Sequence, residues 1–120
     1  MTLDSLRDYC LTKPLVTEEL PFGPDTLVFK VARKVFALAG LDQPELRINL
    51  KCDPARALEL RDRYPDAIQP GWHMNKRHWN SVYPERDGLT DRLVKELIDH
   101  SYTLVIGGLS KRDRAAAGLD

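Results

Sequence analysis

The sequence has few cysteines, no long apolar run and no excess of either charge. Its two cysteines, Cys10 and Cys52, are far apart and match no metal-ligand spacing, which favours free thiols in a reducing compartment. No apolar stretch approaches the roughly 18 residues that a transmembrane helix requires. Met1 precedes an acidic, helix-like stretch, not the basic and apolar segments of a signal peptide. We therefore expect a cytoplasmic protein with no membrane association.

The absence of net charge removes the simplest argument for a nucleic-acid partner. The 120 residues contain 18 Lys and Arg against 18 Asp and Glu. A strongly basic chain would favour nucleic acid, so any anion-binding site here must come from an uneven distribution of charge. The length suits one domain with a single core. We expect that domain to span residues 1–108, with 109–120 as a loosely ordered C-terminal tail.

The common catalytic motifs are also missing. The sequence contains no G-x-S-x-G, no glycine-rich phosphate loop and no C-x-x-C pair. Asp99-His100-Ser101 lies in a helical pattern, where neighbouring side chains point about 100° apart and cannot form a triad. His73 and His78 are five residues apart, which is not a helical metal-ligand spacing. We expect no enzyme activity, no cofactor and no metal site.

Apolar periodicity predicts three helices and six strands. The helices follow suitable N-caps at Thr2, Asp53 and Thr90, and they end at Pro14, Pro65 and Gly107-Gly108. Alternating stretches predict strands at 16–20, 26–31, 34–40, 45–51, 67–69 and 78–83. The order α-β-β-β-β-α-β-β-α indicates an α+β fold with a single antiparallel β-sheet, helices packed on one face and two protruding hairpins.

The first predicted hairpin turns at Ala32-Arg33. A two-residue turn there pairs Phe29 with Phe36, and Leu27 with Leu38, on the core face. Such turns favour Asn or Gly, so a bulged loop and a shifted register remain open.

The outer face of this hairpin is more apolar than a solvated face needs. It carries Val28, Val35, Ala37 and Ala39 beside Lys30. One interpretation is therefore a non-catalytic protein-interaction module, in which this face binds a partner or forms a weak homodimer of an otherwise monomeric protein.

Positive charge is concentrated in the three-stranded meander of residues 26–51. It has five cations against two acids, Asp42 and Glu45, and the cations are Lys30, Arg33, Lys34, Arg47 and Lys51. In a chain of zero net charge this excess indicates a candidate anion-binding surface. A solvated outer sheet face is an equally good interpretation.

The most unusual segment runs from Pro70 to Trp79. It contains both tryptophans, two of the three histidines and two adjacent cations. We interpret it as a loop or hairpin that presents cationic, hydrogen-bonding and aromatic groups together. For Trp72 and Trp79, packing is favoured over base stacking. Lys76-Arg77 is either a phosphate-binding tip or a solvated turn.

Four segments resemble, in order, the signatures of a known family. They are residues 21–31 (PFGPDTLVFKV), 49–54 (NLKCDP), 70–82 (PGWHMNKRHWNSV) and 97–102 (LIDHSY). Together they resemble the MmcQ/YjbR family, whose members are described as DNA-binding with a double-wing arrangement. The resemblance covers about residues 1–110 and implies a YjbR/CyaY-like fold. The chain departs from it at Ala32-Arg33, where the family pattern has glycine.

The resemblance implies that the partner is double-stranded DNA, contacted by the tips of the two hairpins. Cations there can neutralise phosphates, and polar side chains can reach base edges. His73 is a pH-sensitive candidate phosphate partner, whereas His78 and His100 more often act as hydrogen-bonded structural residues. The family's core motif falls on Asn75, Lys76, His78 and Trp79. The full candidate DNA-binding set is Lys30, Arg33, Lys34, Arg47, Lys51, His73, Asn75, Lys76, Arg77, His78 and Trp79.

Overall fold

The structure is a computed structural model that describes residues 1–119 of the chain. Along the chain the elements are α1 (Leu3–Leu11), β1 (Val16–Glu19), β2 (Thr26–Val31), β3 (Lys34–Gly40), β4 (Ile48–Lys51), α2 (Pro54–Arg63), β5 (Ile68–Pro70), β6 (Trp79–Val82), α3 (Asp91–Gly107) and α4 (Lys111–Ala116). The predicted order is confirmed, and α4 follows it. No helix within these residues is long and apolar enough to cross a membrane.

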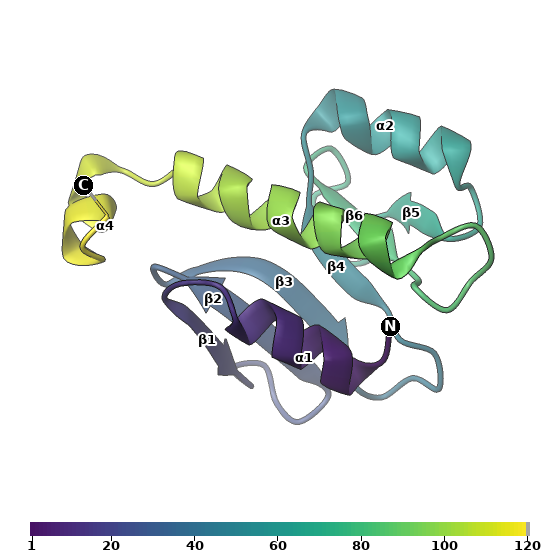
Figure 1. The fold of residues 1–120 in the computed structure, drawn as a ribbon, viewed down its shortest axis with the longest axis horizontal. Coiled ribbons are helices and arrows are strands. Elements are labelled where there is room, and N and C mark those ends of the chain that lie inside the picture. Colours follow the sequence, from purple (N-terminus) through teal and green to yellow (C-terminus); the bar gives the residue numbers. More distant parts are fainter. Residues whose placement is uncertain (120) are drawn as a thin grey trace.

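All six strands of the described chain form one antiparallel sheet in the order β1-β2-β3-β4-β6-β5. Figure 1 shows α1 and α3 in front of the same face of this sheet, with α2 near β5 and β6. The face beneath the helices forms the core, which includes Leu6, Phe29, Ile48, Leu50, Val94 and Ile98. The predicted α+β class with one antiparallel sheet and helices on one face is therefore confirmed.

The opposite face of the sheet, here called the open face, has no helix on it. Strand register places Val28, Leu38, Asn49, Ser81 and Gln69 in a row across this face. Val28 and Ser81 are fully buried, and Asn49 is nearly so. Because a sheet face without helices would otherwise be solvated, other parts of the chain must cover these residues.

The register of the first hairpin differs from the predicted one. The turn does fall at Ala32-Arg33, and both residues adopt the left-handed conformation, with φ of 50° and 67°. However, Phe29 pairs with Ala37 and Lys30 pairs with Val35, so Phe36 is an extra residue in β3. This β-bulge turns both Phe36 and Ala37 toward the core and moves Leu38 to the open face.

The same bulge removes two of the four apolar side chains, Ala37 and Ala39, from the predicted outer face of this hairpin. Ala37 and Ala39 are fully buried in the main core, and Val28 is fully buried on the open face. A partner or dimer surface cannot use these three side chains, because none of them reaches solvent, whereas Val35, the fourth predicted residue, is half-buried.

The C-terminal stretch 109–120 was expected to be loosely ordered, but it contains α4. The Ser110 hydroxyl accepts from the Asp113 N–H at 3.0 Å, which is an N-cap interaction. Arg114 Nη1 donates to the carbonyl of Ile106 at 3.0 Å and ties α4 to the end of α3. Residues of α4 and the Ala32-Arg33 turn line a common surface hollow, so α4 lies beside the first hairpin.

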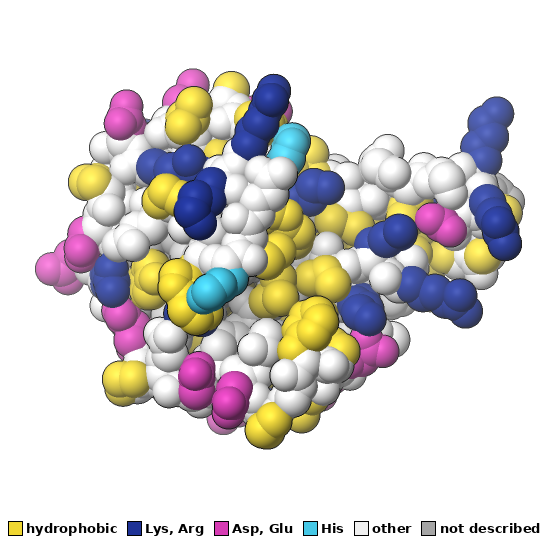
Figure 2. Space-filling model, turned by 180° about the vertical axis from the view of Figure 1, so that it is seen from behind, with side chains coloured by type: hydrophobic (Ala, Val, Ile, Leu, Met, Phe, Trp, Pro, Cys, Tyr) yellow, Lys and Arg dark blue, Asp and Glu magenta, His cyan; other side chains and the backbone are white. Residues whose placement is uncertain are grey.

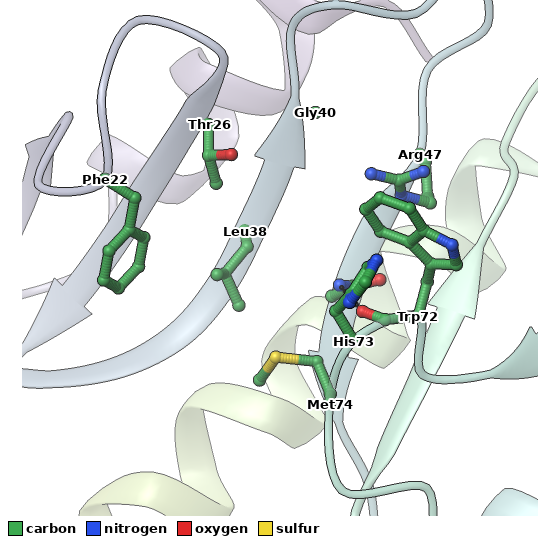
Figure 3. A pocket seen from close by; sticks show the side chains of 9 residues that line it. Phe22, Thr26, Leu38, Gly40, Arg47, Trp72, His73 and Met74 are labelled. Atoms are coloured by element: carbon green, nitrogen blue, oxygen red, sulfur yellow. Dashed lines mark hydrogen bonds between the residues drawn. The ribbon is translucent and has the colours of Figure 1, made fainter.

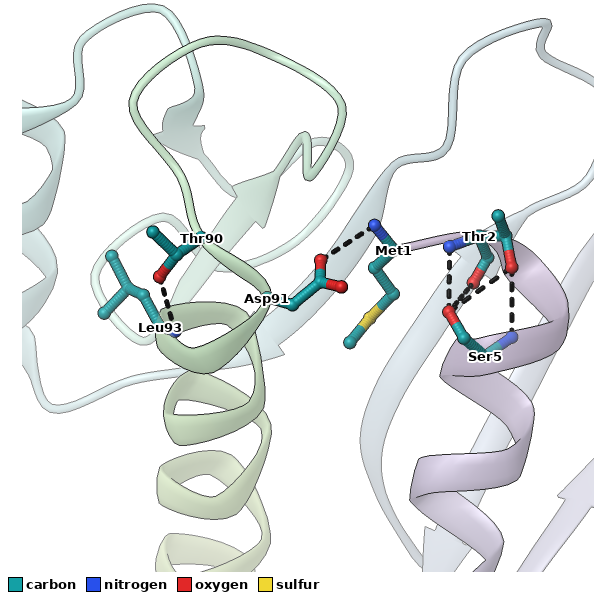
Figure 4. A network of polar contacts seen from close by, with 6 residues as sticks. All are labelled: Met1, Thr2, Ser5, Thr90, Asp91 and Leu93. Atoms are coloured by element: carbon teal, nitrogen blue, oxygen red, sulfur yellow. Dashed lines mark hydrogen bonds and ion pairs between the residues drawn. The ribbon is translucent and has the colours of Figure 1, made fainter.

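Polar contacts connect the beginnings of α1 and α3. The N-terminal ammonium of Met1 lies 2.9 Å from Asp91 Oδ1, as Figure 4 shows. Thr2 and Ser5 form a reciprocal capping box, and the Thr90 hydroxyl accepts from the Leu93 N–H at 3.1 Å. The predicted N-caps at Thr2 and Thr90 are thus confirmed, as is the third at Asp53.

A buried hydroxyl fastens α3 to the sheet. Ser101 Oγ donates to the carbonyl of Phe36 at 2.5 Å and accepts from the Lys51 N–H at 2.9 Å. Ser101 is fully buried, so water cannot replace these partners. One side chain therefore satisfies two backbone groups, one next to the bulge of β3 and one at the end of β4.

Replacing Ser101 with alanine should lower the free energy of unfolding by about 1–3 kcal/mol, because two buried backbone groups lose their partner. Urea unfolding of Ser101→Ala beside the wild type measures this change. Thr103→Ala is the matched control, because Thr103 is an exposed residue of the same helix. Equal stability of the two variants would contradict the role given to Ser101.

Candidate functional site

Strand directions bring both hairpin connections to the same end of the sheet, here called the turn end. β2 runs toward the Ala32-Arg33 turn, and β4 runs parallel to it because β3 is antiparallel to both. β4 ends at Lys51, which pairs with Trp79 at the beginning of β6. The connection between β5 and β6, residues 71–78, therefore begins and ends at this end as well.

The turn end carries cations without acidic partners. The side chains of Arg33, Lys34 and Arg77 are exposed, and Lys51 is half-buried. Among the ion pairs within residues 1–119, none involves these four residues. Asp113 of α4 lines the same surface hollow as Arg33, but within residues 1–119 it forms no ion pair with it, so these four cations have no direct carboxylate partner.

Three other cations of the predicted set interact within the molecule. Lys30 Nζ lies 2.7 Å from Glu19 Oε2 on the neighbouring strand. Arg47 is only 7% exposed, and its guanidinium stacks on the Trp72 ring at 3.9 Å. Lys76 Nζ turns back to donate to the carbonyl of Gly71 at 3.0 Å. We therefore leave these three out of the proposed interface.

The connection between β5 and β6 lies against the open face instead of projecting as a wing. Ser81 Oγ accepts from the Trp72 N–H at 2.9 Å, and Asn49 Nδ2 donates to the carbonyl of Trp72 at 3.1 Å. Ser81 Oγ also donates to Asn49 Oδ1 at 2.6 Å. Two buried side chains of the sheet thus hold both backbone groups of Trp72.

Glycine is required where this connection leaves β5. A Cβ atom at Gly71 would lie 2.8 Å from the Cβ of Trp79 and 2.9 Å from its carbonyl oxygen. The Gly71 N–H donates to that carbonyl at 2.9 Å, so the two backbones cannot separate without losing a hydrogen bond. Any larger residue at this position would push the connection away from β6.

Asn75 and Arg61 fix the tip of the connection. Asn75 Oδ1 accepts from the Arg77 N–H at 3.0 Å, which is the Asx-turn arrangement. Arg61, from α2, donates through Nη2 to the carbonyl of Lys76 and through Nε to Asn80 Oδ1 at 2.7 Å. These contacts leave Arg77 exposed on a well-held backbone. They also give Asn75 a structural role that suits its place in the family motif.

A hollow lies on the open face between this connection and the loop before β2. Its volume is about 280 Å³, and the lining residues are Phe22, Thr26, Leu38, Gly40, Arg47, Asn49, Trp72, His73 and Met74. Figure 3 shows Phe22 and Leu38 on one side, with Arg47, Trp72, His73 and Met74 on the other. Figure 2 shows apolar side chains gathered in the middle of this face, with Lys and Arg side chains above and to the right of them and Asp and Glu side chains below.

His73 projects from the rim of this hollow and not from the turn end. It has a φ of 58°, and its ring packs edge-on against Trp72 with centroids 3.8 Å apart. His78 and Trp79 are half-buried, and the His78 carbonyl accepts from the Cys52 N–H at 2.8 Å. The candidate residues of this segment are thus divided between the hollow, the turn end and the support of the connection.

Within residues 1–119, no group of three or more His, Cys, Asp or Glu side chains could hold a metal ion. His100 Nε2 instead accepts from the Asp53 N–H at 3.2 Å. Burial raises the pKa of Cys10 to about 12 and that of Cys52 to about 11, so both thiols stay protonated near neutral pH. Cys10 is fully buried and packs in the hydrophobic core.

Comparison with known proteins places this arrangement in a family. The YjbR family model matches residues 11–104. The chain belongs to the YjbR family. It is 43% identical to the YbdF protein of Escherichia coli O157:H7 over 92% of this chain and 89% of the relative. It is 30% identical to the YjbR protein of Escherichia coli K12, with 95% of each chain covered.

Solved structures share the YjbR fold. Deinococcus radiodurans protein DR2400, of the domain family DUF419, has a TM-score of 0.88 and 42% identity, covering 99% of this chain and 89% of that one. A crystal structure of a Pseudomonas syringae protein has a TM-score of 0.74 and 28% identity, covering 87% of this chain and 98% of that one. None of these names states an activity, so the YjbR assignment gives the fold and leaves the function to the site.

Sequence reasoning missed the residues that hold the connection in place. The alternation of residues 45–51 puts Asn49 on the outward face of its predicted strand, and the pattern gives Ser81 no special role. Arg61 is one of several charged residues of mixed sign in α2, and nothing in the sequence pattern distinguishes it from the others. One sequence feature could have revealed this contact. Asn49 and Ser81 are both polar and lie opposite each other on paired strands, where their side chains can form hydrogen bonds to the backbone of a loop that covers them.

His100 should make stability depend on pH. Burial, followed by the charge of Arg56, lowers its pKa below the ordinary value of 6.5. The folded state therefore favours neutral imidazole, and protonation favours the unfolded chain. The stability from His100 is present above about pH 6.5 and is lost as pH falls through the lowered pKa.

Urea unfolding at about pH 7.5 and about pH 5.5 tests this, with His100→Gln as the comparison. Glutamine keeps an acceptor for the Asp53 N–H but cannot be protonated. The wild type should lose more stability on acidification than the variant. Equal losses would show that His100 does not titrate differently in the folded and unfolded states.

Proposed function

We propose that this protein binds double-stranded DNA through the turn end of its sheet and has no catalytic role. The strongest support is the strand register, which brings two hairpin connections together at the turn end of the sheet. Four cations there, Arg33, Lys34, Lys51 and Arg77, have no carboxylate partner within residues 1–119. Phosphate groups are the natural partners of such a cluster, because each contact releases a condensed counterion.

The spacing of the two tips suits a DNA groove. The first hairpin is formed by β2 and β3, and the second by β6 and β5, with β4 between them. Neighbouring strands are about 4.8 Å apart, so the hairpin centres are separated by about 14 Å, close to the major-groove width of about 12 Å. Arg33 and Lys34 can then contact one backbone while Arg77 contacts the other, with Lys51 between them.

The remaining family-motif residues position these cations. Asn75 holds the backbone of Arg77 through its Asx turn, and Trp79 lies beneath the connection next to Gly71. The buried contacts of this segment reduce the loss of conformational entropy when Arg77 binds phosphate. We therefore expect mutation of Asn75 to weaken DNA binding by loosening the tip, without removing a charge.

Binding to a short mixed-sequence duplex should weaken as salt rises from about 50 to about 200 mM, as measured by fluorescence anisotropy. Arg33→Ala/Lys34→Ala should reduce affinity on the order of tenfold at low salt and lower the salt slope by about 2. Arg77→Ala should lower the slope by about 1.

Arg63→Ala/Arg92→Ala is the matched control, because it removes two exposed or part-exposed cations from the C-terminus of α2 and the beginning of α3. This variant should bind DNA as the wild type does. Absence of binding by folded wild type at low salt would overturn the proposal. So would a control pair that weakens binding as much as the turn-end pair.

A further inference from the structure

The hollow on the open face contains a buried charge that the fold does not neutralise. Arg47 is 7% exposed, yet no ion pair or side-chain hydrogen bond within residues 1–119 involves its guanidinium. Within the described residues, every side-chain nitrogen or oxygen that is fully enclosed has a hydrogen-bond partner. The guanidinium nitrogens of Arg47 have no partner among these residues, so they must be the part of this side chain that solvent reaches. Because Arg47 lines the hollow, that access is through it.

The surroundings orient this guanidinium without satisfying it. The Trp72 ring covers one face at 3.9 Å, which leaves the N–H edge free to donate. Gly40 leaves room for it, since a Cβ there would lie 3.0 Å from Arg47 Nη2. The Asp42 carboxylate approaches the same glycine but forms no ion pair with Arg47. A buried, unpaired cation is costly, so an anionic ligand at this edge would be strongly favoured.

The other lining residues include Phe22, Leu38, Trp72 and Met74 beside the polar Thr26, Asn49 and His73, and none of them is acidic. Leu38 and Met74 contribute apolar surface to the wall of the hollow, and Phe22 lies across the hollow from Trp72, as Figure 3 shows. Phe22 is 71% exposed and Trp72 is 48% exposed, which is unusual for aromatic side chains of a folded domain. These walls suit a flat or branched apolar body attached to an anionic group.

We propose that the hollow is a binding site for a small organic monocarboxylate with an aromatic or branched apolar body. The Arg47 guanidinium pairs with the carboxylate through its N–H edge, and Phe22, Leu38 and Met74 contact the body. The volume of about 280 Å³ lies at the lower limit for ligand sites, which favours a small metabolite-sized molecule over a peptide. This site is on the open face, and it does not depend on DNA binding at the turn end.

Benzoate is a suitable probe, and benzamide is its neutral counterpart of similar shape. Titration of ¹⁵N-labelled protein with each compound, followed by amide and indole N–H resonances, locates and measures binding. Benzoate should shift the Trp72 indole and the backbone resonances of residues 38–40 and 72–74. It should bind about tenfold or more tightly than benzamide, because only the carboxylate forms a charge-assisted pair.

Arg47→Met keeps the length of the side chain and removes its charge. In this variant benzoate should bind no better than benzamide. Arg92→Met is the matched control, since Arg92 is exposed on α3, and it should keep the wild-type preference. Arg33→Ala/Lys34→Ala should also keep it, which separates this site from the DNA interface.

Equal binding of benzoate and benzamide to the wild type would overturn the proposal without relying on any variant. Shifts confined to residues outside the hollow would do the same. So would a folded Arg47→Met protein that still prefers benzoate.

Discussion

The arrangement of the whole open face depends on one hydrogen-bonded contact, in which Asn49 and Ser81 hold the backbone of Trp72. Without it, residues 71–78 would project from the sheet as an ordinary hairpin loop. With it, the connection folds back, and Gly71 permits the close approach to Trp79 that this requires. The polar residues at the middle of the sheet are thus satisfied by the connection that covers them.

The folded-back connection separates the cations of the protein into those that contact other parts of the chain and those that remain exposed at the turn end. Arg47 becomes buried beneath Trp72, and Lys76 turns toward Gly71, so neither charge is available at the turn end. Arg77 stays exposed at the same end of the sheet as Arg33 and Lys34. A chain with zero net charge can in this way present a local positive surface while another of its cations, Arg47, is buried elsewhere.

Three of the helices, their caps and the order of the elements along the chain could be predicted from the sequence because they depend on local patterns, such as Asp53-Pro54 before α2. The register of β2 and β3 could not, because the bulge at Phe36 depends on how the core accepts two successive side chains. Arg47 lies just before β4 and points to the open face, as its position in the alternating pattern of residues 45–51 predicts. Its burial was not foreseen, because alternation shows which way a side chain points but not which distant loop covers it.

The central claim is that residues 71–78 are fixed against the open face. Backbone ¹⁵N relaxation of the free protein tests it most directly. We expect order parameters of about 0.85 for these residues, equal to those of β4 and β6. Values below about 0.6 would contradict it, because a mobile connection would expose Arg47, open the hollow and leave Arg77 without a fixed position.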